Sequence, residues 1–560
     1  MSDMNLLLQI DSPKSTFLLA FATSALLAGA CSPYLLVAKE LDEPSSVPEA
    51  ISVEASRPND GMVGRPLPLA SHWNTGLGKD GFDPQYQMQM IERGHYLLPW
   101  FHFPAADQQS WNHYYEAPIK KAAELRLPIA LVGTQWEHLL TDDKAYFDLP
   151  PAKNPNVIGS HGKVRREVDP LAPIDPWREV GKVWTSSPMM EKLQAWYPNP
   201  PLVLLVSNNE HAKLSWPKAE ESKRYLDLYG KGRDDNFKRK IFAHEWITRY
   251  RALQQGMREG LTNSNWKRNV IFIGYDAFGP PHLARTRHWK THSLYVPRRI
   301  DPSPLSWDGG SPSYYVHNWN ASTDYTVWSP QIEAMNWVFM LREAYTLNPH
   351  FWFEISTWDG HQPSQPNDKR RTYATRGQTF SPARYGGMVQ FGMWLLRPRV
   401  VREFRGWLET RTEQGPYFLP IVQAVDRVHT NATLRAFWRN GALVANPAHR
   451  HPYQMNMPKE YADVDRWFLL DTNLDPWRPW GLHTQLPVFS LALVMGEKPT
   501  REWLIYAYAP LGPKPNVKVT IPDFAPVTID VPQSGGFYRV EEKTRKVIPV
   551  SGDNGIKTEQ

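Results

Sequence analysis

The chain is poor in cysteine and has no long run of charge of one sign. Cys31 is the one cysteine among 560 residues, which excludes an intrachain disulfide. The formal net charge of +6 is small for this length. No arginine-rich arm, zinc-finger spacing or RNA-binding aromatic motif accompanies this charge. We therefore expect no nucleic-acid partner.

Common catalytic motifs are absent as well. No G-x-S-x-G elbow occurs, so the usual acyl-transfer serine is excluded, and no G-x-x-x-x-G-K-[ST] phosphate loop follows an apolar run. His244 and Glu245 begin like a zinc-binding helix, but position 248 is Thr, which leaves a metalloprotease unsupported. We expect neither a metal nor another cofactor.

An apolar stretch near the amino terminus predicts export. Residues 16–30 carry no charge, follow Lys14 and end directly before Cys31, and they are short for a membrane span. This pattern predicts a signal peptide over residues 1–31. LLAGAC resembles the lipobox of bacterial lipoproteins, although Ala28 stands where that pattern prefers Leu. The resemblance implies acylation of Cys31 and a lipid-anchored protein in the periplasm or at the outer membrane surface. Residues 32–65, rich in Pro, Ser and Glu, predict a linker.

From residue 66 short apolar runs alternate with helical periodicity, which is typical of repeated βα units. A long helix is expected from Lys238 to Leu261. The runs predict strands at residues 66–74, 96–103, 128–137, 201–210, 269–279, 313–319, 351–360 and 399–407. Eight such strands favour a (β/α)8 TIM barrel over residues 66–455. A doubly wound open sheet is the alternative.

After about residue 455 the pattern changes to short alternating runs between Pro, Gly and Asp turns. Strands are expected at residues 466–473, 488–495, 502–509, 517–522, 527–531 and 536–542. This spacing predicts an antiparallel β-sandwich domain over residues 456–560. We expect it to pack against the barrel, with glycan binding as the alternative role.

Two carboxylates stand out at the predicted strands. Glu210 closes the fourth strand in PLVLLVSNNEH, and Glu354 interrupts the seventh, FWFEIS, where a buried charge requires partners. Strands four and seven lie nearly opposite each other in a barrel, so two inward carboxylates can share one cleft. Glycoside hydrolysis uses such a pair. The alternative for Asn208, Asn209 and Glu210 is that they cap the following helix.

These residues carry a resemblance to the clan A (β/α)8 retaining glycoside hydrolases. In that superfamily an Asn-Glu pair ends strand four and a second Glu ends strand seven, which Asn209, Glu210 and Glu354 match. The resemblance spans residues 66 to about 410 in strand order. It implies that Glu210 is the acid/base, that Glu354 is the nucleophile, and that Asn209 binds the sugar 2-hydroxyl.

Aromatic and polar side chains at or just past the predicted strand ends are consistent with a sugar cleft. They are His72, Trp73, Asn74, His102, Gln135, Trp136, Tyr275, Asp276, Tyr315, His317, Asn318, Trp319, Trp358, Asp359 and Trp407. By the same resemblance Tyr315 or His317 contacts the nucleophile. Each of these side chains also has an ordinary interpretation as a core aromatic or a loop cap.

Two basic clusters follow strands five and seven. They are Arg285, Arg287, His288 and Lys290, and then Lys369, Arg370, Arg371 and Arg376. At a cleft rim they would favour an anionic glycan, such as a sulfated galactan of the agar, porphyran or carrageenan type. Two other functions stay open: a polysaccharide lyase acting on uronic glycans, and a non-catalytic glycan-binding surface lipoprotein. Linkage, endo or exo action and oligomeric state are not specified by the sequence.

Overall fold

The computed structural model describes the greater part of the chain from residue 67 onward. The described residues are 67–71, 84–97, 100–101, 108–133, 136–207, 214–275, 303–315, 334, 337–338, 341, 344–345, 348–358, 381–403, 411–444, 446–450, 465–466, 488–510 and 512–551. All of them belong to the unit that begins at Pro44. The predicted signal peptide, Cys31 and the predicted linker lie outside the described residues.

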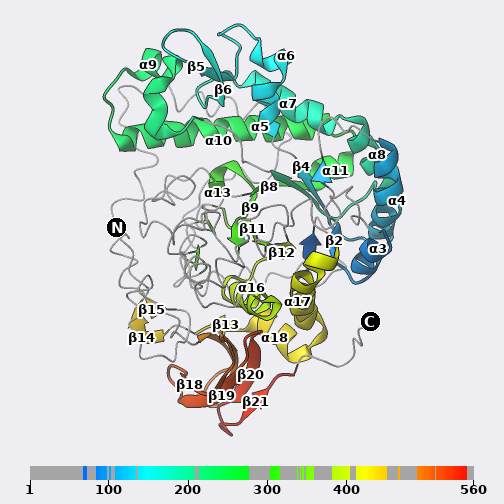
Figure 1. Ribbon diagram of the computed structural model, residues 1–560, viewed down its shortest axis with the longest axis vertical. Coiled ribbons are helices and arrows are strands. Elements are labelled where there is room, and N and C mark those ends of the chain that lie inside the picture. Colours follow the sequence, from blue (N-terminus) through cyan, green and yellow to red (C-terminus); the bar gives the residue numbers. More distant parts are fainter. Residues whose placement is uncertain are drawn as a thin grey trace. The chain divides into compact units, whose positions relative to one another are not determined.

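A parallel sheet forms the centre of the fold (Figure 1). Its strands are β1 (Leu69–Ser71), β2 (Tyr96–Leu97), β3 (Trp100–Phe101), β4 (Ile129–Gly133), β7 (Val203–Ser207), β8 (Val270–Tyr275), β9 (Gly309–Ser311), β10 (Ser313–Tyr315), β11 (Trp352–Trp358) and β12 (Val400–Glu403). Each of the eight predicted strand ranges contains one of these strands or part of one. The apolar runs therefore identified nine of these ten strands, but β9, which pairs with both β8 and β11, lies outside every predicted range.

The strands pair in the order in which they occur along the chain. β1 pairs with β2, β2 and β3 with β4, then β4 with β7, β7 with β8 and β8 with β9. β9 pairs with β11, β11 with β12, and β12 returns to β1, all in parallel. A doubly wound sheet would reverse its strand order. The arrangement is a TIM-like α/β barrel.

Burial on both faces explains why the strands read as continuous apolar runs. The inner face contributes a core that includes Ala130, Leu204, Ile273, Trp352 and Val400. Alternate residues of the same strands point outward into two larger cores beneath the helices. The flanking helices are α3 (Pro84–Glu92), α4 (Gln108–Glu124), α8 (Pro188–Trp196), α11 (Ser264–Asn269), α13 (Ser303–Ser306), α16 (Pro382–Leu396), α17 (Arg411–Thr430) and α18 (Ala432–Asn440).

A long insertion separates β4 from β8 around the central strand β7. It holds α5 (Trp136–Asp142), α6 (Lys144–Phe147), the β5–β6 hairpin (Asn156–Ile158 and Val164–Val168), α7 (Asp175–Thr185), η3 (Trp216–Glu221), α9 (Lys223–Tyr229) and α10 (Asp235–Gly260). The predicted long helix is confirmed as α10, which Asp234 caps by accepting a hydrogen bond from the amide of Phe237.

Glycines let α7 and α10 approach closely. A Cβ at Gly256 would lie 1.8 Å from the carbonyl oxygen of Arg178, and one at Gly181 would lie 2.1 Å from that of Leu253. Any larger residue at either position would collide with the backbone of the facing helix. The two helices are therefore matched to each other at these positions.

The carboxyl-terminal part of the chain is antiparallel, as predicted. One sheet has the order β13 (Ala442–Leu443), β16 (Phe489–Met495), β17 (Glu502–Tyr508), β20 (Gly536–Glu541) and β21 (Val547–Pro549). β18 (Lys514–Thr520) pairs with β19 (Pro526–Val531), and β14 (Asn446–Arg450) pairs with β15 (Asp465–Arg466). Apolar side chains of β17 and β20 share a core with those of β18 and β19.

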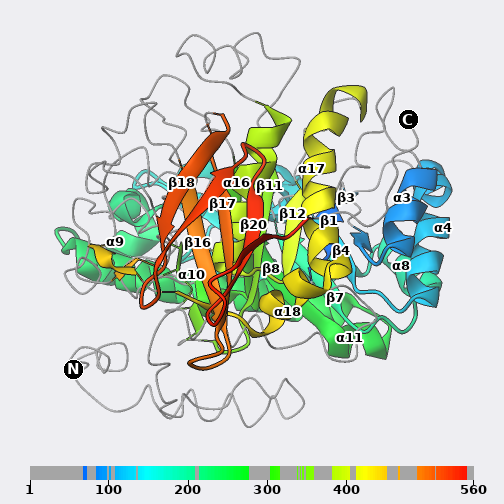
Figure 2. The ribbon, with the colours of Figure 1, turned by 90° about the horizontal axis from the view of Figure 1, so that it is seen from below.

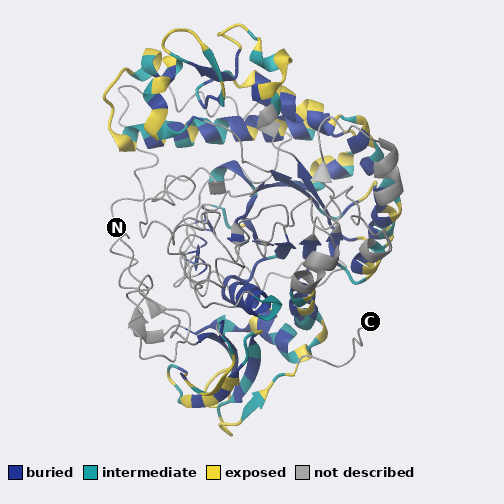
Figure 3. Ribbon diagram, viewed as in Figure 1, coloured by how far each residue is buried: buried dark blue, intermediate teal, exposed yellow. Residues whose placement is uncertain are grey.

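The other face of this sheet joins the core of the barrel through α16, which lies beside β16 and β17 (Figure 2). The hydroxyl of Tyr506 donates to the carbonyl of Gly387 over 2.7 Å, and the hydroxyl of Tyr314 in β10 donates to that of Met388 over 3.1 Å. α16 is buried along nearly its whole length (Figure 3). The helix therefore packs between the barrel wall and the carboxyl-terminal sheet.

Candidate functional site

Glu354 lies on the inner wall of the barrel, within the apolar strand β11. Trp352, two residues earlier, belongs to the inner core, whereas Phe353 and Ile355 point into the outer core. Because side chains alternate along a strand, Glu354 shares the inward side with Trp352. Its relative exposure is 0%, so the carboxylate is removed from bulk solvent.

Two neighbours satisfy this buried carboxylate. The Nε of Arg402 donates to Oε2 over 2.8 Å, and the Nη2 of the same guanidinium lies 2.6 Å from that oxygen. The indole Nε1 of Trp352 donates to Oε1 over 2.8 Å. Arg402 is itself only 3% exposed and projects from β12, the neighbouring strand. The partners that the sequence required for Glu354 are therefore present as an ion pair and a hydrogen bond.

Tyr96 of β2 extends this polar group across the inner wall. Burial raises the pKa of its phenol well above the usual value of 10.0, and the charge of Glu354 raises it further. The phenol therefore stays protonated and available as a donor. The guanidinium of Arg399 lies 5.0 Å from the ring centre of Trp352.

Glu354 occupies a deeper level of the barrel than the resemblance implied. It is the third residue of β11, and the strand continues for four more residues to Trp358. At roughly 3.3 Å per residue this places the Cα of Glu354 about 13 Å below the end of the strand. Glu354 therefore does not end strand seven, although catalytic residues of TIM barrels come from strand ends.

Most of the other predicted site residues lie outside the described residues. These are Glu210, Asn209, Asn208, His72, Trp73, Asn74, His102, Gln135, Asp276, His317, Asn318, Trp319, Asp359 and Trp407, together with both basic clusters. The separation of Glu210 and Glu354 is consequently not part of the described geometry.

Four predicted residues have a described backbone position. Tyr275 ends β8 opposite Ser311 of β9, and Tyr315 of β10 stands opposite Trp358 of β11. These positions come together at the carboxyl ends of neighbouring strands. Trp136 differs, because β4 ends at Gly133 and Trp136 begins helix α5. The expectation that this strand extends to residue 137 is wrong.

The sequence prediction missed Arg402 and Tyr96, which lie in predicted strands but were not singled out. Arg402 was detectable, since a charged residue within the apolar run VVRE poses the same problem as Glu354 in FWFEIS. Tyr96 gave no such signal, because tyrosine is common in strands.

The predicted site also does not include a glycine-rich segment that follows β1 in the sequence. Residues 76–81, GLGKDG, fit the pattern G-x-G-x-x-G and precede α3. This pattern indicates dinucleotide binding only within a doubly wound βαβ unit. The sequential strand order of the sheet does not provide that context, and residues 76–81 lie outside the described residues.

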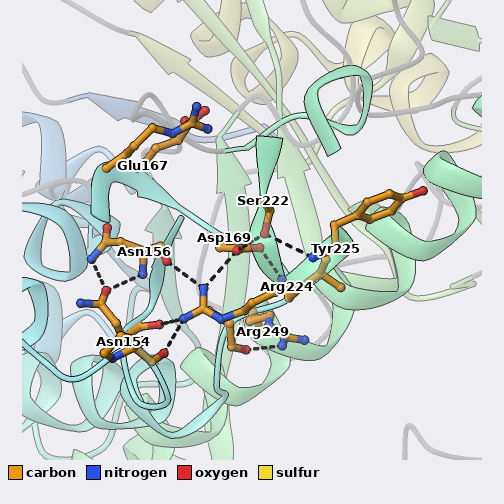
Figure 4. A network of polar contacts seen from close by, with 12 residues as sticks. Asn154, Asn156, Glu167, Asp169, Ser222, Arg224, Tyr225 and Arg249 are labelled. Atoms are coloured by element: carbon orange, nitrogen blue, oxygen red, sulfur yellow. Dashed lines mark hydrogen bonds and ion pairs between the residues drawn. The ribbon is translucent and has the colours of Figure 1, made fainter. Parts of the chain in front are cut away.

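A second buried polar network lies in the insertion (Figure 4). Asp169 accepts hydrogen bonds from the hydroxyl of Ser222 over 2.7 Å and from Nη1 of Arg224 over 3.0 Å. Arg224 also donates to the carbonyls of Pro151, Asn154 and Asn156. Because Arg224 of α9 donates both to Asp169, which follows β6, and to backbone carbonyls in and before β5, this network holds the β5–β6 hairpin against α9.

The described part of the chain contains no group of three or more His, Cys, Asp and Glu side chains suited to a metal. No helix there has both the length and the apolar character that crossing a membrane requires.

The inner-wall ion pair of Glu354 and Arg402, with Trp352 and Tyr96 around it, is thus the candidate site that the described residues provide. Comparison with known proteins assigns it no family: no family model and no curated protein matches the chain.

Proposed function

We propose that the protein is a retaining glycoside hydrolase acting on a poly- or oligosaccharide. In this proposal Glu354 is the nucleophile, Glu210 is the acid/base and Asn209 binds the sugar 2-hydroxyl. The observation that supports it best is the carboxylate of Glu354, which is paired with Arg402 on the inner wall of a TIM-like barrel. Catalytic residues of such barrels come from the carboxyl ends of the strands, so the proposal requires the substrate to reach below the end of β11.

The contacts of Glu354 suit the nucleophile of a double displacement. Such a nucleophile must be ionised and fixed in orientation before it attacks the anomeric carbon. Arg402 balances its charge, while the indole of Trp352 holds the second oxygen at 2.8 Å. Glu210 would protonate the leaving oxygen and then activate water. In a retaining enzyme the carboxyl groups of Glu210 and Glu354 would lie about 5 to 5.5 Å apart.

The finer architecture and the location belong to the same proposal. We propose a complete (β/α)8 barrel followed by a β-sandwich, exported and held at the periplasmic or outer membrane surface by a lipid on Cys31. A sulfated marine galactan is the proposed substrate, on the basis of the two basic clusters. Carbohydrate is the proposed partner, and the chemistry requires no cofactor.

One observation favours a second candidate, a non-catalytic glycan-binding protein. Glu354 is fully buried and both of its oxygens already have partners, as in an ion pair that only stabilises the barrel. In that case the aromatic residues near the strand ends would bind sugar without cleaving it.

A reducing-end assay against neutral, uronic and sulfated glycans tests the proposal. We expect hydrolysis of at least one glycan. Proton NMR should show that the product first formed has the same anomeric configuration as the substrate. Glu354→Gln and Glu210→Gln should each remove this activity. Glu403→Gln is the matched control, because Glu403 is a buried carboxylate of β12 on the outward side.

The fold of each variant is checked by circular dichroism. Full activity in a folded Glu354→Gln protein would eliminate Glu354 as the nucleophile. Glycan binding without cleavage would favour the second candidate, and an unsaturated product absorbing in the ultraviolet would indicate a lyase.

A further inference from the structure

Four buried polar atoms on the inner wall have no hydrogen-bond partner among the described residues: the Oγ atoms of Ser311 and Ser356, and Nη1 and Nη2 of Arg402. Nη2 lies 2.6 Å from Oε2 of Glu354 in the ion pair, so the two Oγ atoms and Nη1 are the three that lack any polar contact within the described part of the chain. Both serines are 0% exposed and Arg402 is 3% exposed. Proteins satisfy nearly all buried groups of this type. The unused capacity of these three atoms points to polar groups that do not come from the described chain.

The three residues lie on adjacent strands. Ser356 of β11 stands opposite Arg402 of β12 in the strand register. Ser311 of β9 precedes Pro312, whose carbonyl accepts a hydrogen bond from the amide of Ser356 over 2.8 Å. The three side chains are therefore contributed by one continuous section of the wall.

Strand alternation directs all three toward the barrel axis. Ser356 and Arg402 share the parity of Trp352 and Val400, which are inner-core residues. Ser311 shares the parity of Gly309, where a Cβ would lie 2.7 Å from Cδ1 of Ile273, another inner-core residue.

The position along the strands is also informative. Ser356 is two residues nearer the carboxyl end of β11 than Glu354, and Ala70 of β1 stands opposite Arg402 on its other side. Serine and alanine are small, whereas large branched side chains dominate barrel interiors. Ser356 and Arg402 therefore lie between Glu354 and the end of the barrel at which TIM-barrel enzymes bind their ligands. Ser311 lies level with Glu354 in the register of β9 and β11.

The charge of this section determines the chemistry of its ligand. The carboxylate of Glu354 lies 2.6 Å from Nη2 of Arg402, so Glu354 already balances the positive charge of Arg402. A sulfate or a carboxylate bound beside Arg402 would also meet the charge of Glu354. Serine hydroxyls both donate and accept hydrogen bonds, which matches the hydroxyl groups of sugars.

We propose that Ser311, Ser356 and Arg402 form a subsite for the uncharged hydroxyl groups of a sugar residue. The inference rests on the proposed function and narrows it, since any charged group of the substrate would bind elsewhere. Ser311 and Ser356 contact the sugar hydroxyls, and Nη1 of Arg402 donates to a sugar oxygen while Nε and Nη2 hold Glu354.

Ligand-observed NMR with the full chain tests the subsite without requiring turnover. The probes are D-glucose, D-galactose, D-mannose and D-xylose, with D-galactose 6-sulfate and D-glucuronate as charged counterparts. We expect at least one neutral sugar to bind, and Ser311→Ala and Ser356→Ala each to weaken it about two- to tenfold, the range for one neutral hydrogen bond. Thr357→Val is the matched control, a buried hydroxyl on β11 that is bonded outward to Tyr385.

Three results would overturn the subsite: no neutral sugar binds, the serine variants bind the neutral sugar as the wild type does, or Ser311→Ala and Ser356→Ala weaken a charged sugar more than its neutral counterpart. Failure of the hydrolase proposal is distinguishable. In that case the serine variants would still weaken sugar binding, while the wild type would cleave none of the glycans.

Discussion

Glu354 and Arg402 form an ion pair on the inner wall of the barrel, with 2.6 Å between Oε2 and Nη2. Both side chains come from adjacent parallel strands and both are almost fully shielded from solvent. A pair of this kind affects stability independently of any role in catalysis, because the loss of one partner leaves the other as a buried charge without a counter-charge.

Replacing one member of this pair should destabilise the protein strongly. We expect Arg402→Met to lower the free energy of unfolding by about 3–5 kcal/mol, because it leaves the Glu354 carboxylate buried without a counter-charge. The double variant Glu354→Met/Arg402→Met should recover most of this loss. Urea denaturation measures both, and a double variant less stable than Arg402→Met would contradict the explanation.

The contact between α7 and α10 should be sensitive to a single methyl group. A Cβ at Gly256 would lie 1.8 Å from the carbonyl oxygen of Arg178, so the helices must separate to accommodate Gly256→Ala. We expect a loss of about 1–3 kcal/mol, despite the better helix propensity of alanine. Lys240→Ala, at an exposed position of the same helix, is the control and should be neutral. Thermal unfolding of the two variants gives the comparison.

Removal of the Arg224 guanidinium should loosen the insertion without affecting the barrel. Arg224 donates to three backbone carbonyls and to Asp169 within 3.0 Å. We expect Arg224→Met to accelerate amide hydrogen exchange across residues 150–170, while β4 stays protected. Arg166→Met is the control, because Arg166 is 66% exposed and its ion pair with Asp142 is long, at 3.6 Å. Equal exchange in both variants would show that the network is dispensable.

The ion pair between Arg178 and Glu259 should make stability depend on acid pH. The hydrogen bond from Arg178 holds the pKa of Glu259 below its ordinary value of 4.5. A carboxyl whose pKa is lowered by folding stabilises the protein at pH values above the pKa it has in the unfolded chain. This contribution is lost as the pH falls through the lower pKa that it has in the folded protein. The melting temperature of the wild type should therefore exceed that of Glu259→Gln at pH 7.

This difference should shrink as the pH falls below 4.5, the ordinary value for Glu259. Differential scanning calorimetry of both proteins from pH 7 to pH 3 provides the measurement. Because both side chains are partly exposed, high salt should also reduce the difference. A difference that does not change with pH would assign the effect of the substitution to packing.

The strands of the barrel were predictable because parallel strands covered on both faces leave uninterrupted apolar runs. IALVG and VLLVS, residues 129–133 and 203–207, are examples, and each is buried throughout. The short strands β13 and β21 gave no comparable signal. Each has only two or three residues, and the pairing with β16 and β20 that defines them is not visible in the sequence.

The candidate site was only partly predictable. The charge of Glu354 in an apolar run correctly indicated that partners must exist, but the run does not show where a strand ends. Its depth below Trp358 follows from the length of β11, which continues through polar Ser356 and Thr357. Arg402 became relevant only once β12 was known to lie beside β11.

The burial of α16 links the two halves of the protein mechanically. The helix is hydrogen-bonded to Tyr314 of the barrel and to Tyr506 of the carboxyl-terminal sheet, and it is buried along nearly its whole length. The barrel and the sheet therefore cannot separate without exposing α16 to water. Heat should consequently melt both halves in one cooperative step. A chain shortened at residue 455 would bare the apolar side of α16 and should aggregate rather than yield an isolated barrel.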